Sequence, residues 1–136
     1  IRGGGANNRE WNGIRYMTGL SGKNVGSQGL SMNLATVPPG ACAYAHIHDG
    51  FEVMLFIWEG KVRHIYGENL ENSIDNEAGD FIYIEPGVPH EVYNIGDGNL
   101  VAMVARSAAD EWDKIIDYPS ARREQDGVPP VKVKPT

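Results

Sequence analysis

The sequence predicts an all-β protein, either an antiparallel sandwich or a small barrel. Three observations lead to this prediction: short strand-like segments recur along the chain, turn residues separate them, and only one segment looks helical. The separators consist mainly of Gly, Pro, Asp and Asn. With 136 residues, of which 41% are hydrophobic, the chain can form one domain with a substantial core.

The strand-like segments fall into two blocks separated by the polar stretch 68–80. The segments of the first block are 28–37, 41–48, 52–58 and 61–67, and those of the second are 81–84, 89–94 and 99–107. The segment 52–58 (EVMLFIW, counted from Glu52) is apolar on both faces, which is typical of a strand inside a packed sheet.

The remaining parts of the chain flank this set of strands. We expect residues 1–27 to form an N-terminal arm, 28–107 the barrel, and 108–136 a C-terminal helix and tail. The head of the arm is rich in Gly and Asn and is expected to be mobile or draped over the body. Within the C-terminal part, residues 108–116 are expected to form a short helix, followed by an extended arm.

The stretch HIHDGFE, residues 46–52, carries the first candidate chemistry. His46 and His48 lie two apart on a predicted strand and therefore point to the same side. In a hairpin with a three-residue loop, Glu52 would lie across from His48 on that same face, whereas a tight two-residue turn would put it on the opposite face. A metal site therefore requires the wider loop, and a polar hairpin tip is the alternative.

His90 favours the metal site, because it supplies a third imidazole from a later hairpin. Three neutral imidazoles and one carboxylate suit a divalent ion of iron, manganese, nickel, cobalt, copper or zinc. Such a set leaves one or two coordination positions open, which is typical of a catalytic site.

Two longer motifs around these residues resemble the cupin superfamily, in particular its small single-domain members. They are GACAYAHIHDGFEVMLFIWEG (40–60) and GDFIYIEPGVPHEVYN (79–94). The resemblance implies a jelly-roll β-barrel (a double-stranded β-helix) that binds one divalent metal, with iron favoured. It also implies the metal ligands His46, His48, Glu52 and His90.

Two positions depart from the family pattern. The gap between Glu52 and Gly60 is one residue longer than usual, which we interpret as a bulge. Glu85 stands where the first proline of the later turn is usual, which leaves the ligands intact but changes the rim of the pocket.

Other residues are candidates for the pocket or the core. Tyr44 and Tyr83 could orient a substrate if they point inward, and Met54, Phe56 and Trp58 are expected to fill or line the barrel. We interpret His64 as a cross-strand or surface residue. Cys42 is expected to be a small buried apolar residue, too far from the histidines to bind the same ion.

Three classes of function follow from a metal-binding barrel. The first is an oxygenase of the dioxygenase type that acts on a small oxygenated molecule such as a diketone, enol or phenolic compound. The second is an isomerase, epimerase or lyase that acts on a sugar or keto acid; a sugar phosphate would require several inward cations, and only Lys61, Arg63 and Arg106 lie near the sheet. The third is a non-catalytic binding protein.

Composition restricts the partners. A net charge of −6 and a pI near 5.1 argue against nucleic acid, and no run approaches the roughly 18 apolar residues of a membrane span. One cysteine and the absence of a leader pattern after Ile1 suggest the cytoplasm. We expect the face of 52–58 that carries Val53, Leu55 and Ile57 to point outward. Such an apolar face needs to be covered, and a second subunit would cover it, so we also expect a homodimer.

Overall fold

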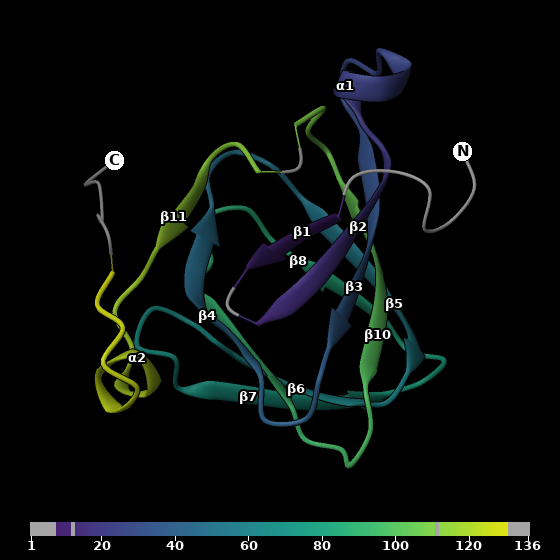
Figure 1. Ribbon diagram of the computed structural model, residues 1–136. Helices are drawn as coiled ribbons and strands as arrows, with labels where there is room; N and C mark the ends of the chain where they lie inside the picture. The colour runs from purple at the N-terminus through teal and green to yellow at the C-terminus, as the bar shows by residue number, and fades with distance from the viewer. Residues whose placement is uncertain (1–7, 12, 111, 131–136) are drawn as a thin grey trace.

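The computed structural model of this protein describes residues 8–11, 13–110 and 112–130. The described strands form two antiparallel sheets that pack face to face with the core between them (Figure 1). The first sheet has the order β1 (Asn8–Trp11), β2 (Ile14–Leu20), β3 (Ser31–Val37), β10 (Leu100–Arg106), β5 (Val53–Glu59) and β8 (Phe81–Ile84). The second has the order β11 (Ile115–Asp117), β4 (Cys42–His48), β9 (His90–Asn94), β6 (Lys61–Tyr66) and β7 (Asn72–Glu77). The predicted all-β jelly roll is therefore confirmed.

Side chains that alternate along the strands build the core between the two sheets. In β10 the buried positions are every second residue, and they face buried positions of β3 and β5 across the sheet. The largest fully buried apolar side chains are Ile14, Ile57, Val62 and Leu100. No helix in the described ranges is long and apolar enough to cross a membrane.

The first sheet begins earlier in the chain than expected. β2 pairs with β3 along most of its length, and β1 pairs with β2, so residues 8–11 and 14–20 of the expected arm 1–27 belong to the sheet. The short helix α1 (Gly22–Val25) links β2 to β3. Residues 1–7 and 12 lie outside the described part of the chain. The polar stretch 68–80, for which the sequence predicts no strand, contains β7, which pairs with β6.

The expected helix over 108–116 is not formed by the described residues of that segment. Lys114 has a φ of 59°, which is incompatible with an α-helix. Ile115 starts β11, whose backbone pairs with β4, and the Trp112 ring packs edge-on against Tyr16. These tertiary contacts outweigh the helical tendency of a segment that is too short to be helical by itself.

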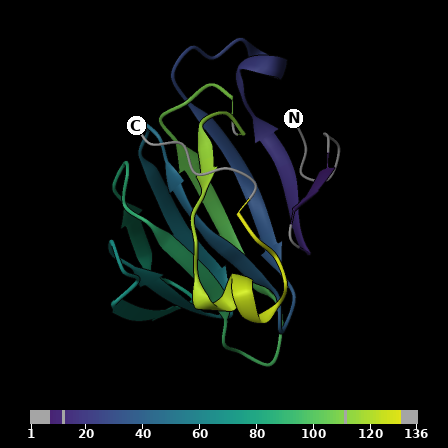
Figure 2. The same ribbon diagram turned by 90° about the vertical axis from the view of Figure 1, so that its left-hand side faces the viewer.

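The short C-terminal helix is instead α2 (Ala121–Gln125), which lies over the outer side of the second sheet (Figure 2). Its buried Arg123 donates to the backbone oxygen of Ala45 in β4 and pairs with Asp117. The Ser120 hydroxyl, which caps the helix, donates to the buried Glu91 of β9. The helix is therefore attached to β4 and β9 by polar side chains rather than by an apolar face.

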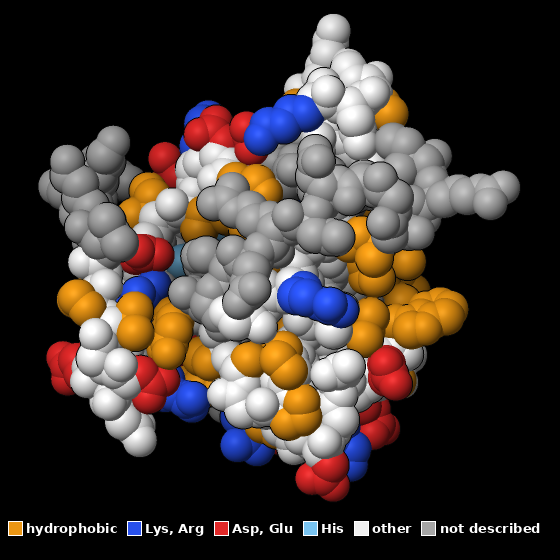
Figure 3. Space-filling model, viewed as in Figure 1, with side chains coloured by type: hydrophobic (Ala, Val, Ile, Leu, Met, Phe, Trp, Pro, Cys, Tyr) orange, Lys and Arg blue, Asp and Glu red, His pale blue; other side chains and the backbone are white. Residues whose placement is uncertain are grey.

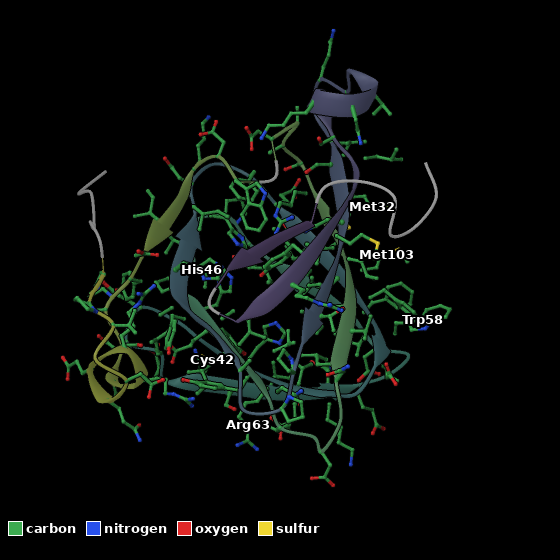
Figure 4. The ribbon with its side chains drawn as sticks, in the orientation of Figure 1. Met32, Cys42, His46, Trp58, Arg63 and Met103 are labelled. Atoms are coloured by element: carbon green, nitrogen blue, oxygen red, sulfur yellow. The ribbon has the colours of Figure 1, made fainter. Side chains whose placement is uncertain are left out.

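The two faces of β5 are the reverse of the prediction. Val53 and Ile57 are buried in the core and Leu55 packs against it, whereas Met54 and Trp58 are exposed on the outside. Hydrophobic side chains gather on the right-hand side of Figure 3, the side on which Figure 4 shows Trp58 pointing away from the barrel. The face that carries Val53, Leu55 and Ile57, for which the sequence predicts a covering subunit, is therefore the inner face.

Candidate metal centre

Three histidines come together on the inner face of the second sheet. His46 on β4 is the direct cross-strand partner of His90 on β9. His48 lies two residues further along β4, on the same face as His46. The ring centroids are 4.3 Å apart for His46 and His90, 4.5 Å for His48 and His90, and 5.0 Å for His46 and His48. One ring nitrogen from each lies within 4.8 Å of the other two, so the cluster could hold one metal ion.

A bulge in β4 turns these two strand residues toward the interior. Ala43 faces Val92, but His46 already faces His90, so β4 holds one residue more than β9 between these pairs. The backbone groups of Ala45 find partners outside β9's ladder: its N–H donates to a Glu91 carboxylate oxygen at 2.9 Å, and its carbonyl accepts from Arg123 at 3.0 Å and from the backbone N–H of Tyr118 at 2.9 Å.

Because of the same bulge, the Tyr44 side chain points away from the pocket. The Tyr44 hydroxyl donates to Asp126 at the end of α2, and its ring lies under the guanidinium of Arg123. The prediction that Tyr44 lines the pocket is therefore wrong, because the additional residue reverses the alternation between Ala43 and His46. Cys42 is buried as expected, but it pairs with Tyr93 on the other side of the bulge.

Hydrogen bonds define which nitrogen of two of the imidazoles carries the proton. Nδ1–H of His46 donates to the Tyr44 carbonyl at 2.7 Å, and Nδ1–H of His90 donates to the Val88 carbonyl at 3.0 Å. A carbonyl oxygen only accepts, so the lone pair of each ring is on Nε2, the arrangement usual for a metal-binding histidine.

Burial keeps all three imidazoles neutral. It is the main cause that lowers the pKa of His48 to about 2 and of His90 to about 4, and it lowers the pKa of His46 well below its usual value. Neighbouring imidazoles add to the effect for His46 and His48, as does the buried Arg106. Neutral imidazoles are the form that binds a metal, so the donor set fits a divalent transition ion.

Glu52 does not join this cluster. Its side chain is exposed and accepts a hydrogen bond from the Tyr83 hydroxyl at 2.7 Å on the outer surface of the first sheet. The prediction that Glu52 faces the histidines is wrong because it assumed a hairpin between β4 and β5. These strands belong to different sheets, so residue parity does not carry across the connection.

Phe51 takes the position next to the histidines instead. Its ring is 3% exposed and stacks on His48, with centroids 4.8 Å apart and planes 25° apart. An apolar ring therefore stands beside the cluster where the sequence predicts a carboxylate. This contact restricts the orientation of the His48 ring, whose Nδ1 has no hydrogen-bond partner in the described part of the protein.

A cavity of about 490 Å³ connects this region to the surface. It lies where the edge strand β8 of one sheet approaches the edge strand β7 of the other. His64, Ile84 and His90 line both this cavity and a smaller inner one that contains all three clustered histidines. Tyr83 borders the larger cavity, but its side chain is 49% exposed and its hydroxyl donates to Glu52. A substrate-orienting role for Tyr83 stays a prediction.

The positive side chains near the sheet do not form a phosphate site. Lys61 is exposed, and Arg63 pairs with Asp75 at 2.8 Å and points outward from β6 (Figure 4). Arg106 lines the inner cavity and donates to Asn33. None of the described residues that line the larger cavity is Lys or Arg.

His64 is the pocket residue whose place the sequence did not reveal. It is 3% exposed, so of the two predicted alternatives the surface role is wrong, whereas His64 does lie between two strands, opposite Ile74 and Val92. Burial, with a smaller effect from His90, lowers the pKa of His64 to about 4. It lies outside the three-imidazole cluster. The strand KVRHIY places His64 on the same face as Val62, but pattern alone does not say which face is inward.

Comparison with known protein families agrees with this architecture. A family model described as "Cupin domain" matches residues 33–106. Germin-like protein 8-14 of Oryza sativa subsp. japonica is 28% identical over 97 residues, which are 69% of this chain and 46% of that protein.

Solved structures give a consistent picture of the fold. Oxalate decarboxylase of Bacillus subtilis matches 76% of this chain and 28% of its own, with a TM-score of 0.66 and 25% identity. The formate complex of oxalate decarboxylase from Lactobacillus farciminis matches 91% of this chain and 36% of its own, with a TM-score of 0.71. At 17% identity the second likeness shows the fold alone. This chain thus spans less than half the length of each of these three proteins.

Proposed function

The chain belongs to the cupin family, and from this premise we propose that it is a mononuclear metal-dependent oxygenase of the dioxygenase type. Its substrate would be a small oxygenated molecule such as a diketone, an enol or a phenolic compound. The observation that carries the proposal is a cluster of three buried neutral imidazoles that lines an inner cavity and that no carboxylate of the described residues joins.

The ligand set bears on the charge of the substrate. His46, His48 and His90 are neutral, so they leave the two positive charges of a bound ion uncancelled. Uncompensated charge in a buried site is costly, which favours a substrate that binds as an anion, such as an enolate or a catecholate. A bound ferrous ion would supply open coordination positions for such a substrate and for dioxygen.

Residues of the chain would hold and isolate the reactants. The carbonyl groups of Tyr44 and Val88 fix the ring orientation of His46 and His90, and Phe51 restricts His48. The inner wall is mostly aliphatic, which excludes water from the reacting groups. The lack of Lys and Arg among the described residues of the larger cavity argues against a phosphorylated substrate.

The test of this proposal is oxygen uptake. Apoprotein loaded with Fe(II) under argon is mixed with 2,4-pentanedione or 4-nitrocatechol in oxygenated buffer, and oxygen is followed with an electrode. We expect oxygen to be consumed in proportion to the substrate, and the uptake to be lost in His90→Ala. Absence of uptake with every diketone, enol and catechol tried would contradict the proposal.

A second candidate is a lyase that acts on a small carboxylic acid. The structural likeness to oxalate decarboxylase of Bacillus subtilis, at 25% identity, favours it. A carboxylate would also satisfy the uncancelled charge of the ion. Release of carbon dioxide from oxalate by the manganese-loaded protein, without net oxygen uptake, would support this candidate over the oxygenase.

A further inference from the structure

His64 is a buried polar side chain whose hydrogen-bonding capacity the described fold does not use. Neither ring nitrogen has a hydrogen-bond partner among the residues that the structure describes, although the side chain is 3% exposed. Buried polar groups in folded proteins nearly always have a partner, because an unpaired one destabilises the folded state. An exception requires a specific explanation, such as a site that a ligand completes.

The position of His64 suggests which ligand completes it. His64 pairs with Val92 across β6 and β9, and His90 lies two residues from Val92 on the same inner face. His64 and His90 are thus diagonal neighbours across two strands. The His64 side chain borders both the inner cavity with the three imidazoles and the larger cavity that opens between β7 and β8.

The surroundings of His64 do not call for a polar side chain for packing. Its neighbours on the same face are Val62 on its own strand and Val92 across from it, both of which pack in the core. A leucine or phenylalanine at this position would fill the same space without a hydrogen-bonding requirement. A neutral imidazole, by contrast, offers one donor and one acceptor.

We propose that His64 is a substrate-binding residue, which hydrogen-bonds an oxygen of the organic molecule held at the three-histidine centre. This inference rests on the proposed metal-dependent function and adds a recognition element to it. The substrate would therefore carry, besides the anionic oxygen that binds the ion, a hydroxyl or carbonyl group directed toward β6. Enols, diketones and catechols with neighbouring oxygens satisfy both requirements.

The test uses a redox-silent form of the whole protein and a coloured probe. Wild-type protein, His64→Leu, His64→Phe and His64→Gln are loaded with Zn(II), and their zinc content is measured by mass spectrometry. Each is titrated with 4-nitrocatechol, whose absorption changes when it binds. We expect the same zinc content in all four, about tenfold weaker 4-nitrocatechol binding in His64→Leu and His64→Phe, and partial recovery in His64→Gln.

Thermal stability distinguishes a binding role from a structural one. Because His64→Leu removes an unpaired buried polar group, we expect its zinc-free form to melt at the same temperature as the wild type or higher. Ile65→Ala is the matched control: Ile65 is the half-buried neighbour of His64 on β6, and it lines neither the inner nor the larger cavity. It is expected to melt lower and yet to bind 4-nitrocatechol like the wild type.

Three outcomes would overturn the inference about His64. They are unchanged probe binding in the leucine and phenylalanine variants, an equal loss of binding in Ile65→Ala, and failure of the zinc-loaded wild type to bind 4-nitrocatechol at all. None of these three depends on the oxygen-uptake assay. Oxygen uptake by the iron-loaded wild type alongside any of them would leave the proposed oxygenase function standing without a role for His64.

Discussion

His90 of β9 lies beside both histidines that β4 contributes to the metal centre. It lies directly opposite His46, and its ring is within 4.5 Å of both other imidazoles, measured between centroids. We expect His90→Ala to lower the affinity for a divalent ion such as Zn(II) by about 100-fold or more, because one of three ligands is lost. Competition with a chromophoric chelator measures this affinity.

Glu52→Ala is the matched variant for this prediction. The Glu52 carboxylate is exposed and bonded to Tyr83 on the outer surface, so its removal should change the zinc affinity by less than about threefold. Circular dichroism of both variants controls for folding. A loss of affinity in Glu52→Ala comparable to that in His90→Ala would contradict the three-histidine assignment.

The bulge of β4 is the element that directs the histidines inward. The backbone N–H of Ala45 donates to Glu91, and its carbonyl accepts from Arg123 as well as from the backbone N–H of Tyr118; the Glu91 and Arg123 side chains are both buried. The Glu91 carboxylate also accepts from Ser120 and from the nearby Tyr93 hydroxyl. The C-terminal helix α2 therefore stabilises the strand that carries two of the three metal ligands, although α2 itself lies on the outside of the sheet.

Arg123→Leu tests this connection. The Arg123 guanidinium is 3% exposed and bonds both Ala45 and Asp117, so its loss should lower the free energy of unfolding by about 2–4 kcal/mol. We also expect Zn(II) affinity to fall by about tenfold, because the bulge behind His46 loosens. Denaturant unfolding and the chelator competition measure the two effects.

The neighbouring Arg122 provides the control for this variant. Its ion pair with Asp126 is partly exposed and lies within one turn of α2, so Arg122→Leu should cost less than about 1 kcal/mol and leave Zn(II) affinity unchanged. Equal effects of the two substitutions would mean that α2 contributes only general stability.

The strands show how far the sequence alone can predict this fold. Strand positions from β3 to β10 were predictable, apart from β7, because turn residues separate short apolar segments. The inward direction of His46, His48 and His90 was also predictable, since all three histidines lie in the two motifs that resemble the cupin superfamily. Each of these features depends on local pattern.

The faces of β4 and β5 were not predictable in the same way. The bulge at Tyr44 depends on Glu91 and Arg123, which lie 46 and 78 residues from Ala45. The direction of Glu52 depends on the passage of the chain from one sheet to the other. Both are tertiary effects, and a change of parity by one residue reverses every side chain that follows.

At the scale of the whole molecule, the outer face of the first sheet is unusually apolar. Its exposed hydrophobic side chains come from the adjacent strands β3, β10, β5 and β8: Met32, Met54, Trp58, Phe81, Tyr83 and Met103. Phe81 is 79% exposed and Trp58 is 64% exposed. A contiguous apolar surface of this kind is typical of a protein–protein interface.

A second copy of the chain is the partner that we expect on this face. Two such sheets related by a twofold axis would bury the same aromatic and methionine side chains on both sides, which suits a homodimer. We expect sedimentation velocity to give a dimer for the wild type and a monomer for the double variant Trp58→Lys and Phe81→Lys, because two buried charges per subunit would oppose association. Val25→Lys on α1, an exposed apolar residue outside the face, is the control and should remain dimeric. A monomeric wild type at micromolar concentration, or a dimer that the double variant leaves intact, would show that this face has another role.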